Sequence, residues 1–128
     1  MRGRLLGLML AGSLTCGGAS LAAHHAFSKT YRSDAAVTID GVLMALVYRN
    51  PHSFLEITAP DDSGRPRRWA VEWGSSQLVR RTLTSGELQP GDRLIVTGDI
   101  SRDQAAWRLR LRTIVRPSDG WRWSEAAR

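Results

Sequence analysis

Residues 37–58 read V-T-I-D-G-V-L-M-A-L-V-Y-R-N-P-H-S-F-L-E-I-T, and this stretch decides the fold. Apolar residues recur at every second position from Val37 to Val47, which predicts a long, half-buried β-strand. Gly41 alone interrupts the period, and a glycine in a strand often marks a bulge or bend. The run stops at the turn R-N-P-H, residues 49–52, and resumes at residues 53–58. We therefore expect a hairpin whose bent first strand belongs to two sides of a small barrel.

The rest of the chain predicts three more strands and one short helix. A polar turn at residues 59–66 leads to a strand at 67–73, a helix at 77–83 follows a serine N-cap, and strands follow at 93–100 and 106–115. The residues expected to face inward are Trp69, Val71 and Trp73 on the third strand, Leu78, Val79 and Leu83 on the helix, and Trp107, Leu109, Leu111 and Thr113 on the last strand. The expected barrel core consists of Leu43, Val47, Leu55, Ile57, Val71, Val96, Leu109 and Leu111.

The order of three strands, a helix and two strands predicts an all-β fold with one short helix, a five-stranded OB-fold-like Greek-key barrel over residues 37–116. An SH3-like barrel is the alternative, but it would not need a helix at this position. We expect an extended arm at residues 23–36 before the barrel. The tail at residues 117–128 contains G-W-R-W, residues 120–123, which could form a short extra strand.

Residues 1–22 have the three parts of a secretory signal peptide. Arg2 and Arg4 precede an apolar run at residues 5–14, and small residues follow at 17–22. The apolar run is shorter than the roughly 20 residues that a membrane-spanning helix requires, so no transmembrane segment is expected in the mature chain. Cleavage after Ala22 fits best, with cleavage after Ala23 as the alternative. The prediction is a periplasmic or secreted protein.

The mature chain is moderately basic and has no cysteine. Without Arg2 and Arg4, 16 of the 18 basic residues remain against 12 acidic ones, a net charge of about +4. The single cysteine, Cys16, lies in the segment expected to be removed, so the mature chain would have no disulfide. A basic protein in the cytoplasm would suggest nucleic acid as a partner, whereas an exported one favours anionic glycans, lipid headgroups or acidic proteins.

Several short motifs together resemble one family. They are A-H-H-A-F at residues 23–27, N-P-H at 50–52, W-A-V-E-W-G-S at 69–75, L-V-R-R at 78–81 and L-Q-P-G-D at 88–92. This set is similar to the small secreted bacterial proteins catalogued as domain of unknown function 6152, over nearly the whole mature chain. Ala26 replaces the family's usual serine, and Trp73 stands where a small residue is common. The resemblance implies the fold and secretion, and it implies no established activity.

Histidines in two of these motifs suggest a metal site. If cleavage follows Ala22, the amine of Ala23, two backbone amides and the imidazole of His25 form a square-planar set of four nitrogens, which suits Cu(II) or Ni(II). Cleavage after Ala23 would instead leave the amine and imidazole of His24 as a chelate. His24 and His52 could add a ligand. The alternatives are a solvated leader for His24 and His25, and a ring that caps backbone groups in the turn for His52.

Arginines on the fifth strand suggest a second kind of site. Arg108, Arg110 and Arg112 share the outward parity, and Arg116 lies just beyond them. Either they pair with acidic residues of neighbouring strands, or they form a stripe that binds an anionic glycan or a partner protein. Only Tyr48 and Phe54 are outward aromatics, too few for a nucleic-acid stacking platform. No catalytic motif is visible, so we expect a binding module and not an enzyme.

Overall fold

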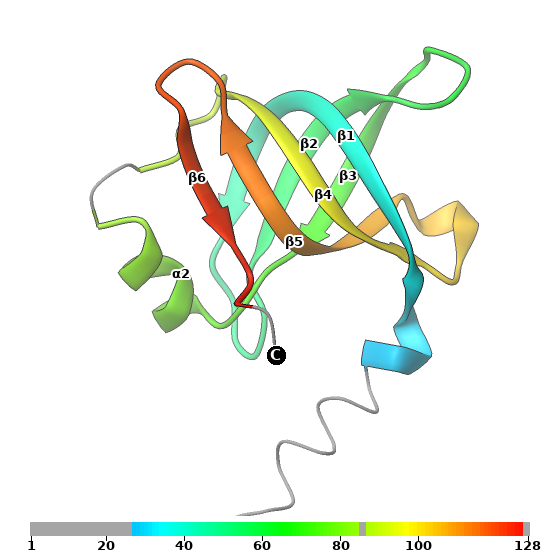
Figure 1. Ribbon diagram of the computed structural model, residues 1–128, viewed down its shortest axis with the longest axis horizontal. Helices are drawn as coiled ribbons and strands as arrows, with labels where there is room; N and C mark the ends of the chain where they lie inside the picture. Colours follow the sequence, from blue (N-terminus) through cyan, green and yellow to red (C-terminus); the bar gives the residue numbers. More distant parts are fainter. Residues whose placement is uncertain (1–26, 85–86, 127–128) are drawn as a thin grey trace, which may run out of the picture.

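The computed structural model describes residues 27–84 and 87–126 and shows strands wrapped into a barrel with one short helix beside it (Figure 1). The expected signal peptide and Ala23, His24 and His25 lie outside the described residues. The strands are β1 Tyr31–Val47, β2 Phe54–Pro60, β3 Pro66–Glu72, β4 Arg93–Ser101, β5 Arg108–Arg116 and β6 Trp121–Ser124. The helices are α2 Ser76–Thr82 and the 3-10 helix η1 Gln104–Ala106.

Hydrogen bonding closes the sheet into a ring. The strand order is β3-β2-β1-β4-β5-β6, with an additional pairing between β3 and β5. The β3–β5 pairing is parallel, whereas all the other pairings are antiparallel. Because β5 closes on β3, strands β1 to β5 form the ring and β6 is added at the side of β5. This arrangement, with α2 between β3 and β4, confirms the predicted OB-fold-like barrel.

β1 belongs to two sides of the barrel, as its length predicted. Its first part pairs with β4 through Val42, and its last part pairs with β2 from Val42 onward. The strand arches across the top of the barrel in Figure 1. Gly41 allows the close approach at this crossing, because a Cβ there would lie 2.4 Å from the backbone oxygen of Thr58. The bulge itself lies at Met44, where the register between β1 and β2 shifts, and not at Gly41.

The segment before Val37 is more regular than the sequence indicated. Residues 27–30 form a helical turn, and β1 begins at Tyr31 with a second irregularity in its pairing to β4 between Arg32 and Ala36. Residues 27–30 are therefore helical where an extended arm was expected, and residues 31–36 are extended but belong to β1 and not to a separate arm. Arg32, Ser33 and Asp34 are polar and exposed, so this part of β1 leaves no apolar period in the sequence.

The barrel interior contains the expected core with one exception. The largest fully buried apolar side chains are Leu43, Leu55, Ile57, Leu94, Leu109, Ile114, Val71, Val79 and Val96. Val47, expected in the core, is only half-buried because it lies at the open end of β1. Trp69 and Trp73 are 4% exposed, so both are core residues as predicted.

The alternation of β5 changes side halfway along the strand. Leu109 and Leu111 are buried as predicted, but Thr113 is half-buried and Ile114 is completely buried. The pairing with β4 shows why: Thr97 lies opposite Thr113 and Gly98 opposite Leu111, so Arg112 is an extra residue. Trp107 lies before the strand in a left-handed conformation at φ 43° and is only partly buried.

The helix and the tail follow the prediction closely. Ser75 caps α2, with its hydroxyl accepting a bond from the Leu78 amide, and Val79 and Leu83 are buried. Leu78 is 45% exposed, so its expected inward position is wrong. The extra strand of the tail is present as β6, and its two tryptophans pack against the core. No helix among the described residues has the length and apolar character to cross a membrane.

Candidate functional site

A buried carboxylate at the end of β3 is the centre of the main polar cluster. Glu72 is 5% exposed; it accepts bonds from the Tyr31 hydroxyl and from Arg108 Nη2, the latter at 2.5 Å, and forms an ion-pair contact with His52 Nδ1. Buried carboxylates are stable only when they are paired and hydrogen-bonded. Three partners from three separate parts of the chain meet that requirement here.

The fold brings these partners to Glu72 by strand pairing. In the parallel β3–β5 ladder Glu72 lies opposite Arg110 and Ala70 opposite Arg108, so both arginines start close to the carboxylate. Tyr31, 2% exposed, is the first residue of β1. The turn that carries His52 is tied to the end of β3, since the Ser53 amide donates to Gly74 and the Trp73 amide donates to Ser53, each at 2.8 Å.

Charge in this cluster is balanced by one arginine. Glu72 and Arg108 form an ion pair with side chains 6% and 35% exposed. Burial and the hydrogen bond to Glu72 raise the pKa of the Tyr31 phenol above its ordinary value, so this side chain stays a neutral donor. The Nδ1 atom of His52 faces the Glu72 carboxylate, so Nε2 is the ring nitrogen that this contact leaves unused.

Phe27 fastens the start of the described chain onto this cluster. Its ring stacks on the His52 ring, with centroids 4.9 Å apart and planes 27° apart. The Arg110 guanidinium lies 4.7 Å from the Phe27 ring centroid, and Arg110 also binds Asp99 and Glu125. Phe27 is thus inserted between an imidazole and a guanidinium that are both held by carboxylates.

A pocket of about 540 Å³ opens beside His52, between the start of α2 and the end of β6. Its walls include Phe27, His52, Glu72, Trp73, Leu78 and Trp123. The two tryptophans contact each other with ring centroids 5.0 Å apart. The lining combines aromatic and apolar side chains with polar and charged ones, and such a mixture is common in small-ligand and cofactor sites. The imidazole of His52, with its side chain 32% exposed, is therefore reachable from solvent.

The four arginines expected to form an anion-binding stripe are all paired with carboxylates. Arg108 binds Glu72, and Arg110 and Arg112 both bind Asp99, whose side chain is 2% exposed. Arg116 binds Asp92 at 3.0 Å and Asp119 at 2.7 Å. Of the two interpretations of these arginines, the structure shows the pairing with neighbouring strands. This face presents little unbalanced positive charge to a glycan or a partner.

The two outward aromatics do not form a joint surface. Tyr48 is 37% exposed, and the Arg80 guanidinium lies 4.1 Å from its ring centroid. Phe54 is half-buried and lies 5.0 Å from the Arg108 guanidinium. Each ring is thus covered by its own arginine. Neither is arranged to stack a base.

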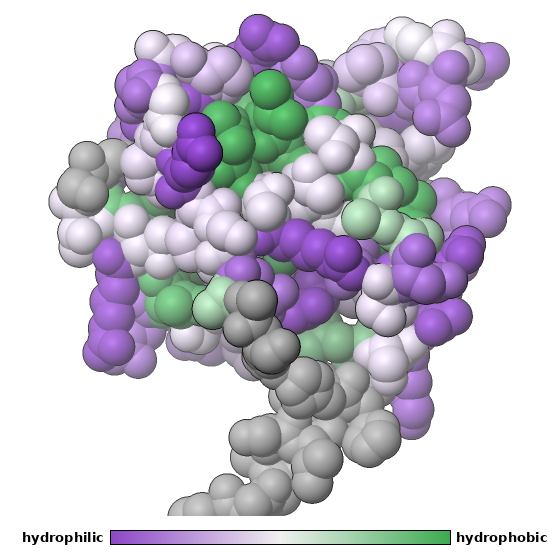
Figure 2. Space-filling view, viewed as in Figure 1, coloured by the Kyte–Doolittle hydropathy of each residue, from purple (hydrophilic) through white to green (hydrophobic). Residues whose placement is uncertain are grey.

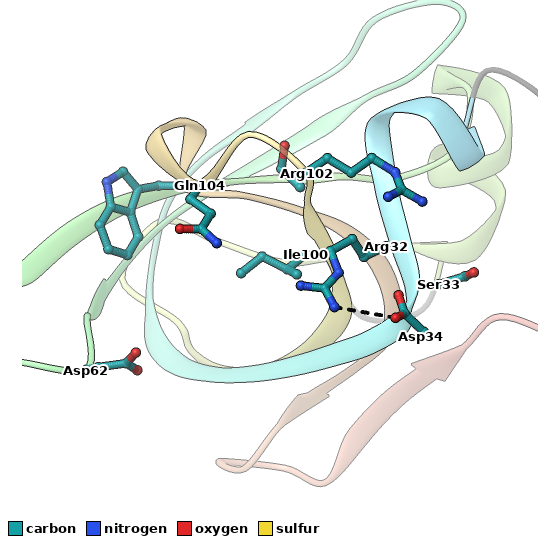
Figure 3. Close-up of a pocket in the computed structure, with 9 residues that line it drawn as sticks. Arg32, Ser33, Asp34, Asp62, Ile100, Arg102 and Gln104 are labelled. Carbon is teal, nitrogen blue, oxygen red and sulfur yellow. Dashed lines mark hydrogen bonds and ion pairs between the residues drawn. The ribbon is translucent and has the colours of Figure 1, made fainter.

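A second hollow, of about 1010 Å³, lies at the opposite side of the β1 start (Figure 3). Arg32 and Asp34 point toward each other there and form an ion pair at 3.4 Å, while Gln104 belongs to η1. Arg102 donates from Nε to the backbone oxygen of Ser28 at 2.9 Å. The Arg32–Asp34 pair is exposed on both sides, 46% and 72%, so solvent screens it. Ser101, a buried polar side chain that lines this hollow, already accepts a bond from the Asp103 amide at 3.2 Å.

Sequence reasoning identified His52 but missed the residues around it. The alternation of the third strand puts Glu72 on the face opposite Val71, and Tyr31 and Phe27 lie within the expected extended arm. The sequence contained one signal for this cluster. If the arginines of the fifth strand pair with acidic residues of neighbouring strands, Glu72 and Asp99 are among the possible partners. Among residues 27–84 and 87–126, no group of three or more His, Cys, Asp or Glu side chains could hold a metal ion.

Comparisons with known proteins add a family and no activity. A family model described as Family of unknown function (DUF6152) matches residues 11–110. Neither the curated proteins nor the solved structures contain a significant match to this chain.

Proposed function

Since the chain belongs to the family of unknown function DUF6152, whose description assigns no activity, we propose a function from the site itself. The protein is an exported, non-catalytic binding module that holds Cu(II), or Ni(II), at its mature N-terminus, with His52 as an additional ligand. The stacking of Phe27 on His52 is the observation that carries this proposal.

The contact between His52 and Glu72 supports a ligand role for this histidine. Metal-binding histidines usually donate their second ring N–H to a carboxylate, which fixes the tautomer and the orientation of the ring. His52 has this arrangement, because Nδ1 meets the Glu72 carboxylate and Nε2 is left for a metal. The carboxylate is itself held by Tyr31 and Arg108, so the imidazole is supported by a buried network.

Chain connectivity supports the participation of the N-terminal nitrogens. An extended chain advances at most about 3.6 Å per residue, so connectivity limits the distance between the Cα atoms of His25 and Phe27 to about 7 Å. Because Phe27 is stacked on His52, this short connection would allow the nitrogens of residues 23–25 to reach an ion bound by the His52 ring. The adjacent His24 and His25 could thus serve the same ion as His52, which is far from them in the sequence.

The donor set suits copper or nickel by its chemistry. An amine, two deprotonated amides and an imidazole favour square-planar Cu(II) or Ni(II), and neutral imidazoles also suit Cu(I). His52 would add a fifth nitrogen to Cu(II). If cleavage follows Ala23 instead, the amine and imidazole of His24 would form the chelate, and His25 and His52 would complete it. In both cases the ligands must lose protons, so affinity should fall as the pH decreases.

Copper titration of the chain that begins at Ala23 tests the proposal. We expect one equivalent of Cu(II) with a square-planar absorption band, lost in His25→Ala and weakened by one extra residue before Ala23, which leaves every side chain in place. His52→Ala should weaken binding and change the electron paramagnetic resonance spectrum. Glu72→Gln should lower affinity by roughly 10- to 100-fold. Equal copper affinity in the His25→Ala, His52→Ala and extended chains would show that this site does not exist.

A further inference from the structure

The turn after β1 and helix α2 carry positive charge without acidic residues to balance it. Residues 44–55 and 73–84 contain no aspartate or glutamate, and three arginines lie within them: Arg49, Arg80 and Arg81. All three are exposed. Within residues 27–84 and 87–126, none of them forms an ion pair with a carboxylate, in contrast to the four arginines of β5 and its end.

Side-chain contacts hold the two segments together as one surface. The Asn50 side-chain oxygen accepts bonds from the Ser76 amide at 3.2 Å and from the Ser76 hydroxyl at 3.0 Å. The Arg80 guanidinium lies over the Tyr48 ring at 4.1 Å. Because Arg49 follows Tyr48 directly, all three arginines are at the same corner of the barrel. We call Tyr48, Arg49, Leu78, Arg80 and Arg81 the basic surface.

Two apolar side chains are exposed among these cations. Leu78 is 45% and Tyr48 37% exposed, which makes them two of the few large apolar side chains that the described chain leaves in solvent. Helix α2 turns Val79 and Leu83 toward the core, so Leu78 and Arg81, three residues apart, share the outer side. Figure 2 shows strongly hydrophilic residues beside hydrophobic ones at this corner, at the lower left of the view.

We propose that the basic surface binds an anionic lipid bilayer. Arginines attract acidic headgroups, while a leucine and a tyrosine beside them can enter the boundary between headgroups and acyl chains. The long arginine stems can cover apolar surface while their guanidinium groups stay among the phosphates. A specific protein partner would cover about 800 Å² on each side, which takes about 20–30 residues, whereas the basic surface consists of five. This inference is independent of the copper site.

The expected contribution of the arginines is large enough to measure. Each basic residue near an anionic membrane strengthens binding about fivefold, so three should contribute on the order of a hundredfold. The attraction acts over about a Debye length, so it should decrease steeply between low and physiological salt.

Vesicle co-sedimentation of the chain that begins at Ala23, with a metal chelator present, tests the inference. The vesicles contain phosphatidylcholine with or without phosphatidylglycerol. We expect binding only to the anionic vesicles, reduced on the order of a hundredfold by the joint change of Arg49, Arg80 and Arg81 to Ser. The matched control changes Arg65, Arg68 and Arg122 to Ser, which removes the same charge. Arg65 and Arg68 belong to the β2–β3 hairpin, at the opposite side of the barrel from α2 in Figure 1.

Each outcome supports or overturns the inference. An equal loss in the control variant would mean that net charge alone drives binding, and absence of binding to anionic vesicles at low salt would also overturn it. Leu78→Ser should weaken vesicle binding without changing retention on a soluble polyanion such as polyglutamate. If Leu78→Ser has no effect on either and the soluble polyanion competes fully, the surface recognises an acidic polymer or peptide and not a bilayer.

Discussion

The position of Ile114 gives a sharp test of the bulge in β5. Ile114 is completely buried and lies opposite Val96 on β4 and Trp123 on β6. Ile114→Ala removes three carbon atoms, a transfer loss of about 2.4 kcal/mol at about 0.8 kcal/mol per carbon. The cavity left behind increases the total cost to about 2–5 kcal/mol. Thr113→Ala should change the free energy of unfolding by about 1 kcal/mol or less, since the side chain is half-buried.

Urea denaturation followed by tryptophan fluorescence measures both costs. With a slope of about 2 kcal/mol per M, Ile114→Ala should lower the midpoint by about 1–2.5 M, and Thr113→Ala by at most about 0.5 M. The slopes of both variants should match that of the parent, so that the midpoints compare stability alone. Strict alternation along β5 would give the opposite ranking, with Thr113 inside. A larger midpoint shift for Thr113→Ala than for Ile114→Ala would refute the bulge at Arg112.

Three further predictions follow from the same geometry. Gly41→Ala should destabilise the fold by about 1–3 kcal/mol, since its Cβ would lie 2.4 Å from the Thr58 backbone oxygen. The control Val42→Ala, at an exposed position, should change stability by about 0.5 kcal/mol or less. Equal melting temperatures of the two variants would contradict this prediction. The raised pKa of Tyr31 adds stability that is complete below the unfolded pKa of about 10 and is lost as the pH rises through the folded pKa, so denaturation between pH 8 and 11 should show a loss in the parent that Tyr31→Phe lacks. N-terminal sequencing of exported protein should begin at Ala23, and a chain that still begins at Met1 would exclude cleavage.

The sequence predicted the barrel because its strongest signals are local. The period of two in β1 and β2, the serine cap of α2 and the strand count all depend on residues that are close in the chain. The bulge in β5 depends on a distant contact instead. A Cβ at Gly98 would lie 2.4 Å from the Arg110 backbone oxygen, so the glycine of β4 permits the close approach at which β5 gains its extra residue. The residue pattern of β5 alone therefore cannot predict the bulge, because the contact that permits it involves β4.

The polar cluster could not be predicted for a similar reason. Tyr31, His52, Glu72 and Arg108 come from four segments, and only the closure of β5 on β3 and the folding of the 48–53 turn onto Gly74 bring them together. Glu72 lies where its strand ends, and alternation fails there because Val71, Glu72 and Trp73 are all buried. A strand end at the rim of a barrel is covered by neighbouring loops on both faces, so parity no longer separates inside from outside.

The arginines show what strand alternation can predict and what it cannot. It predicts the side of the strand on which a residue lies, but not the acidic residue with which it pairs. Parity correctly placed Arg108, Arg110 and Arg112 on one side of β5. Whether their positive charge is balanced depends on the carboxylates of Glu72 on β3 and Asp99 on β4. In the part of the chain that the structure describes, Arg49, Arg80 and Arg81 form no ion pair with a carboxylate, and residues 44–55 and 73–84 contain no acidic residue. A row of like charges on a strand is therefore weak evidence for an anion site, since adjacent strands can supply counter-charges at 5 Å spacing. The arginines of α2 and of the turn after β1 lie in segments that contain no acidic residue, so no carboxylate of these segments balances their positive charge. For that reason the basic surface is the better candidate for an anionic partner.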